Sequence, residues 1–118
     1  MTRLTFKPEH VHKILNGTKT ATFRRRLPSG LTGGGRTVAA VTSKDGKPAF
    51  LTKAEDAFAH LTVLCVDPIQ FLDYNEQDAK EAGFTSLTEA RAWYLATDPT
   101  LEPHSYLYRI RFIWVPMP

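Results

Sequence analysis

The sequence has little of what marks a secreted, membrane-spanning or metal-binding protein. It contains a single cysteine among 118 residues, so no disulfide can form within the chain. No apolar run reaches the length of a membrane-spanning helix, and residues 1–4 do not begin an apolar leader. We therefore expect a cytoplasmic protein that has no membrane partner.

Histidine is also scarce and scattered. His10 and His12 are two apart on a predicted helix, so their side chains point about 200° apart. His60 and His104 have no cysteine or histidine close to them in the sequence. We predict no metal site and no cofactor, and a structural or exposed position for each histidine.

The rest of the composition suits one globular domain. Hydrophobic residues make up 42% of the chain and charged residues 23%, which are ordinary values for a folded domain. The net charge of +3 is unevenly distributed, because residues 1–53 carry +9 and residues 54–118 carry −6. A basic first half favours an anionic partner such as RNA or a nucleotide, although folding can also intermix the two signs on one surface.

Apolar periodicity predicts an α+β fold. Six strands are predicted, over residues 4–6, 20–25, 37–43, 48–53, 58–66 and 106–115. Three helices are predicted, over residues 8–16, 75–82 and 86–95. Asp45-Gly46 is expected to form a hairpin turn and Asp67-Pro68 to end a strand. Because no linker or repeat divides residues 1–118, we expect a single domain with a closed or strongly curved sheet and helices over its openings.

The segment most able to carry chemistry is residues 17–24, Gly-Thr-Lys-Thr-Ala-Thr-Phe-Arg. The chain turns through Lys19 and then enters a strand, where alternation places Thr20, Thr22 and Arg24 on one face. Lysine supplies a point charge or a base, threonine a nucleophile or a hydrogen bond, and arginine a planar fork for phosphate or carboxylate. The pattern predicts a ligand site.

Two residues outside this row are further candidate ligand contacts. Arg26 could bind a phosphate together with Arg24. Tyr74, beside the predicted second helix, could stack on a base, whereas Trp93 is expected to pack in the core. The plain alternatives are a surface arginine that aids solubility and a tyrosine that only packs.

The chain resembles an ASCH domain, a family of the PUA-like superfamily, in four features. These are the spacing of Gly17, Lys19 and Arg24, the helix before it, Gly83-Phe84 before a capped helix, and the closing aromatic strand. The resemblance covers residues 6–112. It implies a small PUA-like β-barrel with flanking helices, and a cleft beside the lysine turn of the kind associated with RNA or nucleotide ligands.

One position of the motif departs from the usual family pattern, Gly-x-Lys-x-x-Glu-x-Arg. Thr22 stands where glutamate is expected, as in the bacterial N4-acetylcytidine amidohydrolase branch that the chain is similar to. There the motif lysine, the threonine and a glutamate before the later helix are the proposed catalytic residues. The resemblance thus implies Lys19 and Thr22 as catalytic residues, together with Glu81, which lies one residue before the glutamate's ungapped place at Ala82.

Three functions are compatible with the sequence. The first hypothesis is an ASCH domain that binds RNA or a modified nucleoside around Lys19, Thr22 and Arg24. The second is an amidohydrolase acting on N4-acetylcytidine or a related acylated base, in which Thr22 attacks and Lys19 takes its proton. The third is a non-catalytic protein-interaction adaptor, because a fold does not determine a function.

Overall fold

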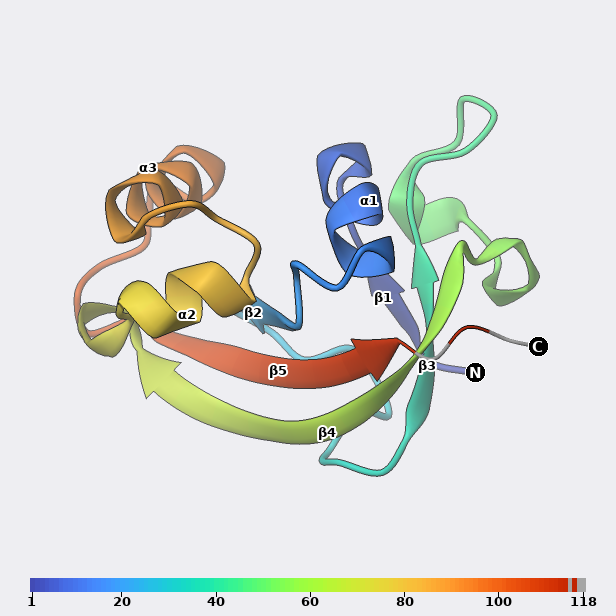
Figure 1. Ribbon diagram of the computed structural model, residues 1–118, viewed down its shortest axis with the longest axis horizontal. Coiled ribbons are helices and arrows are strands. Elements are labelled where there is room, and N and C mark those ends of the chain that lie inside the picture. Colours follow the sequence, from blue (N-terminus) through green and yellow to red (C-terminus); the bar gives the residue numbers. More distant parts are fainter. Residues whose placement is uncertain (115, 117–118) are drawn as a thin grey trace.

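A computed structural model of the chain describes residues 1–114 and 116, and within them five strands and three α-helices form an α+β fold (Figure 1). The strands are β1 (Arg3–Thr5), β2 (Ala21–Arg24), β3 (Thr37–Val41), β4 (Ala59–Gln70) and β5 (Tyr106–Trp114). The helices are α1 (Pro8–Leu15), α2 (Glu76–Glu81) and α3 (Leu87–Thr97). Three short 3-10 turns span Ala49–Leu51, Ala54–Asp56 and Phe71–Asp73.

The three helices begin at the residues that their capping signals indicate. Pro8 occupies the first position of α1, where its missing N–H costs nothing. The Asn75 side chain accepts from the backbone N–H of Asp78, whose carboxylate accepts in turn from the backbone of Asn75, which caps α2. The Ser86 hydroxyl caps α3 in the same way. None of the helices in the described part of the chain has the length and apolar character needed to cross a membrane.

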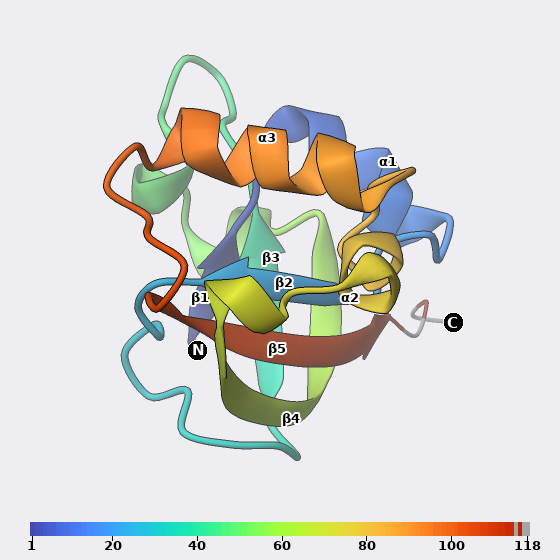
Figure 2. The same cartoon turned by 90° about the vertical axis from the view of Figure 1, so that its left-hand side faces the viewer.

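The five strands form one mixed sheet in the order β1-β3-β4-β5-β2. β1 and β3 are parallel, and all other neighbours are antiparallel. The long strands β4 and β5 bend strongly, and all three helices lie on the same side of this pair (Figure 1). From the side, α3 extends across β2 with α1 beyond it (Figure 2). The curved sheet with helices over one side agrees with the predicted α+β fold.

The prediction of a closed β-barrel is wrong, because the sheet is open. β1 and β2 are its two edges, with only 3 and 4 residues, which leaves few backbone groups that could pair across the gap. A side chain spans this gap instead. The Arg24 guanidinium, at the end of β2, donates to the Thr5 carbonyl and, over 3.4 Å, to the Thr5 hydroxyl at the end of β1.

Two strand predictions are also corrected. The predicted strand over residues 48–53 is a 3-10 turn, although the Asp45-Gly46 turn before it forms with positive φ angles of 52° and 79°. Pro68 does not end β4, which continues to Gln70. β3 pairs with β4 only as far as Thr62, so the missing N–H of Pro68 faces no partner strand. Residue 115, predicted as the end of the last strand, lies outside the described residues.

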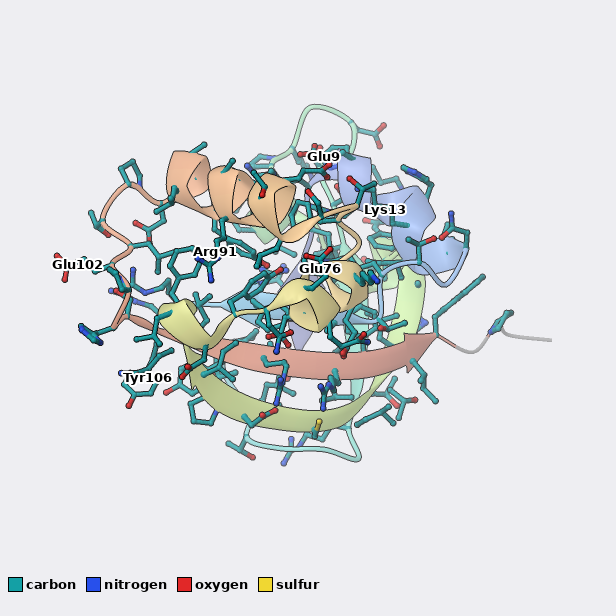
Figure 3. All side chains as sticks on the ribbon, turned by 60° about the vertical axis from the view of Figure 1, so that its left-hand side comes forward. Glu9, Lys13, Glu76, Arg91, Glu102 and Tyr106 are labelled. Atoms are coloured by element: carbon teal, nitrogen blue, oxygen red, sulfur yellow. The ribbon has the colours of Figure 1, made fainter. Side chains whose placement is uncertain are left out.

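The buried side chains form two clusters on the helical side of the sheet. The first packs under α1 and includes Phe6 and Phe112, and the second packs under α2 and α3 and includes Phe23 and Tyr94. Figure 3 views the molecule from the side of α3 and shows Arg91 below that helix. Residues from both clusters line the cavity described next.

Candidate functional site

A cavity of about 520 Å³ is enclosed by the β1–α1 junction, β2, α3 and the loop around residues 43–49. Its volume lies in the range of small-molecule sites. The lining combines aromatic side chains with basic ones. The aromatic members are Phe6, Phe23, Phe84, Trp93 and Tyr94, and the basic members include the buried Lys19 and the partly buried Arg24.

Lys19 is held at the inner end of this cavity and is only 4% exposed. Its backbone N–H donates to the Lys13 carbonyl at the end of α1, and its Nζ donates over 2.8 Å to the carbonyl of Ala82 at the end of α2. Gly83 permits this contact, since its φ is +90° and a Cβ there would lie 3.2 Å from the Lys19 Cβ. Burial, followed by the charges of Arg24 and Lys13, lowers the pKa of Lys19 well below its ordinary value.

Thr22 and Arg24 lie side by side on β2. The Thr22 hydroxyl oxygen is buried and accepts from Arg24 Nε over 3.1 Å, which leaves the hydroxyl proton free to be donated. The Arg24 guanidinium also lies 5.1 Å from the centroid of the Phe6 ring. Burial lowers the pKa of Arg24 from its ordinary value, which is so high that the guanidinium stays charged.

Lys19 and Arg24 have no carboxylate partner in the described part of the chain, unlike Arg25, which also lines the cavity. Among the residues that the structure describes, no ion pair involves Lys19 or Arg24. The one carboxylate of the lining is Asp98, which lies 2.8 Å from Arg25 at the end of α3. Buried charges in proteins are usually paired, so the cavity has an uncompensated positive character.

Glu81, the third predicted catalytic residue, is turned away from the cavity. Its carboxylate accepts from Arg111 Nε over 2.9 Å, and Glu81 is not part of the lining. Only its backbone carbonyl reaches the motif, where it accepts from the Thr20 N–H. Ala82, the other position considered for this acid, contributes a carbonyl oxygen to Lys19. The structure therefore brings Lys19 and Thr22 together without a glutamate.

The other predicted ligand contacts lie outside the cavity. Thr20 precedes β2 and Arg26 follows it, so strand alternation does not extend to either, and both are exposed. Arg25, which strand alternation would place on the opposite face from Arg24, also lines the cavity. Tyr74 is 1% exposed and packs in the second cluster with its ring 4.9 Å from that of Phe23, so no stacking face is open to a base.

His10 and Trp93 line the cavity, a role that the sequence reasoning gave to neither. His10 is 5% exposed, and no hydrogen-bond partner for its Nδ1 exists among the described residues. Burial and then the charge of Lys19 lower the pKa of His10 to about 4, so the ring is neutral at pH 7. Its place four residues before the buried Ile14 was the signal that could have placed it inward. Nowhere in the described chain do three or more metal-ligating side chains gather.

Comparison with known proteins places this site in a recognised fold. No protein family and no curated protein matches the sequence. A variant of the ASCH protein from Zymomonas mobilis superposes with a TM-score of 0.62 over 95% of this chain and 68% of that one, at 14% identity. The ASCH domain from Lactobacillus crispatus superposes with a TM-score of 0.59 over 88% and 69%, at 19% identity. This chain has the ASCH-domain fold.

A match to a further solved structure covers both chains almost completely. The hypothetical protein PH0355 superposes with a TM-score of 0.66 over 96% of this chain and 97% of its own, at 14% identity. The two ASCH matches confirm the predicted α+β fold of an ASCH domain. At such identities only the fold carries over, so the ligand has to be argued from the cavity itself.

Proposed function

We propose that the cavity binds a nucleobase-bearing ligand, RNA or a modified nucleoside, around Lys19, Thr22 and Arg24. One observation carries this proposal: the buried Lys19 and the partly buried Arg24, which have no carboxylate partner among the described residues, line a cavity that also contains five aromatic side chains. A ligand with negative charge or several acceptor oxygens would supply the missing partners. The Thr22 hydroxyl adds a donor beside them.

The aromatic part of the lining supports a base as the second feature of the ligand. Phe84, Trp93 and Tyr94 contribute rings to the cavity, and proteins that recognise single-stranded RNA stack exposed bases on such rings. The neutral His10 lies edge-on to Trp93, with 5.5 Å between ring centroids, and can offer a further hydrogen bond to a base edge. A nucleotide combines the two chemistries that this cavity presents.

Binding is tested by calorimetric titration with nucleosides, their 5′-monophosphates and short single-stranded RNA. Lys19→Met keeps the length of the side chain but removes its donors, and we expect it to weaken binding about tenfold or more. Lys80→Met, an exposed lysine on α2 outside the lining, is the matched control and should leave affinity unchanged. Absence of binding, or equal losses in both variants, contradicts the proposal.

An amidohydrolase is the second candidate, favoured by the lowered pKa of Lys19 in the same cavity as Thr22. A neutral Lys19 amine would accept the Thr22 hydroxyl proton while the oxygen attacks an acyl carbonyl. The carbon–nitrogen bond then breaks, the leaving amine takes that proton, and water hydrolyses the acyl-threonine. Glu81 has no part in this scheme, because its carboxylate faces Arg111.

The amidohydrolase is tested by incubating the protein with N4-acetylcytidine and following the release of cytidine. Thr22→Ala should abolish release, and Glu81→Gln should leave it unchanged. If no cytidine forms, this activity is excluded for this substrate and the binding function stands. An interaction adaptor would show neither turnover nor nucleotide binding.

A further inference from the structure

We infer that the ligand is a single-stranded nucleotide chain rather than a free nucleoside, and that a groove beside the cavity holds the neighbouring nucleotide. This inference rests on the proposed binding function. The groove measures about 490 Å³ and is lined by residues that include Arg3, Thr5, Pro28, Ser29 and Phe50. Of these residues, only Thr5 contacts a residue of the proposed binding site, through its hydrogen bonds from Arg24.

The groove and the cavity adjoin at Thr5, which lines both. A second link is sequential, because Ala49 lines the cavity and the next residue, Phe50, lines the groove. The Arg24 guanidinium is hydrogen-bonded to Thr5 and therefore places a positive charge at the boundary. A chain with one base in the cavity and the next in the groove would carry its linking phosphate past this charge.

Phe50 provides the surface on which the second base would stack. Its ring is 67% exposed on the 3-10 turn Ala49–Leu51. The chain has seven phenylalanines, and among the described residues the other six each pack against an aromatic ring, whereas Phe50 packs against none. An open aromatic face beside a basic site is the arrangement that single-strand binding proteins use.

Arg3 adds a positive charge to the groove and fixes it to the same turn. Its Nη1 donates over 2.7 Å to the Thr52 carbonyl and over 3.4 Å to the Phe50 carbonyl. No carboxylate of the described chain forms an ion pair with Arg3. The described lining of the groove contains no acidic residue. The positive charge of Arg3 therefore suits a phosphate group of a ligand.

The test compares a nucleoside 5′-monophosphate with the single-stranded trinucleotide of the same base, for each of the four bases, by calorimetric titration. We expect the trinucleotide to bind about tenfold more tightly or better. Phe50→Ala should remove this advantage and leave the monophosphate affinity unchanged. Leu51→Ala is the matched control, since Leu51 is 55% exposed on the same turn but does not line the groove. Arg3→Gln should reduce the salt slope for the trinucleotide by about 0.7.

The outcomes separate the inference from the function on which it rests. Equal affinity for the monophosphate and the trinucleotide overturns the inference and leaves nucleotide binding intact. A trinucleotide advantage that survives Phe50→Ala, or that is lost equally in Leu51→Ala, also overturns it. Equal affinity for polyglutamate would show a general polyanion site and would overturn it too. If neither the monophosphate nor the trinucleotide binds, the proposed function and this inference both fail.

Discussion

The basic side chains of the cavity differ from those on β5 in the partners that they have. On β5, Arg109 and Arg111 pair with carboxylates, which are Asp67, Asp78 and Glu81. In the cavity, Lys19 and Arg24 donate to neutral oxygens, which are those of Thr5, Thr22 and Ala82. The comparison separates charges that the protein satisfies from charges that it leaves for another molecule.

The pKa directions of the two groups show the same contrast. Hydrogen bonds to Asp67 raise the pKa of Arg109, because they stabilise its charged form. Burial lowers the pKa of Lys19, because nothing in its surroundings fully replaces water around an ammonium group. We conclude that the β5 pairs contribute to stability, whereas the cavity cations are maintained at some cost to it.

The largest expected effect on stability comes from removing a carboxylate that pairs with a β5 arginine. Asp78 is 3% exposed, binds Arg109 and completes the cap of α2 with Asn75. Asp78→Ala leaves Arg109 short of one partner and should lower the free energy of unfolding by about 3 kcal/mol. Chemical denaturation measures this loss, with the exposed Gln77→Ala on the same helix as control. A loss no larger than that of the control would contradict the assigned role of the pair.

The next effect concerns the unpartnered histidine of the cavity. The pKa of His10 falls from an ordinary 6.5 to about 4 on folding, so the unfolded chain takes up a proton first as the pH decreases. Stability is therefore complete above about pH 6.5 and decreases down to about pH 4, by about 2 kcal/mol after solvent screening. His10→Leu should remove this part of the pH dependence, as measured by thermal melting. A wild-type protein as stable at pH 4.5 as at pH 7 would contradict it.

The smallest change in stability is expected for the cavity lysine. Lys19→Met removes a buried ammonium that has no carboxylate partner, so the gain from avoided desolvation offsets the lost bond to Ala82. The free energy of unfolding should stay within about 1 kcal/mol of the wild-type value, while nucleotide affinity falls. A loss as large as that of Asp78→Ala would show that Lys19 is a structural anchor and would abolish the contrast.

The sequence predicted the centre of the site because that centre is local. Strand alternation places Thr22 and Arg24 on one face of β2, and the glycine stop after α1 places Lys19 before them. The same alternation did not hold for Thr20, because β2 begins only at Ala21. The direction of a side chain just outside a strand is set by the loop backbone and not by the alternation of the strand.

The surrounding wall could not be predicted, because its members are far apart in the sequence. Trp93 and His10 come from α3 and α1, which meet only through tertiary packing. Glu81 shows a different error. Its backbone lies next to the motif, as predicted, but its carboxylate pairs with Arg111 on β5 and not with Lys19. An ion pair between a helix and a strand that lie 30 residues apart in the sequence carries no signal in either local segment.

By itself the sequence determined the helix starts, most of the strands and the row of Lys19, Thr22 and Arg24, because caps, glycines and alternation act over a few residues. Only the tertiary structure decided that the sheet remains open, that Arg24 spans its edges, and that no carboxylate of the described residues pairs with Lys19 or Arg24. Those outcomes depend on which distant segments of the chain pack together. Local sequence patterns extend over only a few residues, so they do not reveal such contacts.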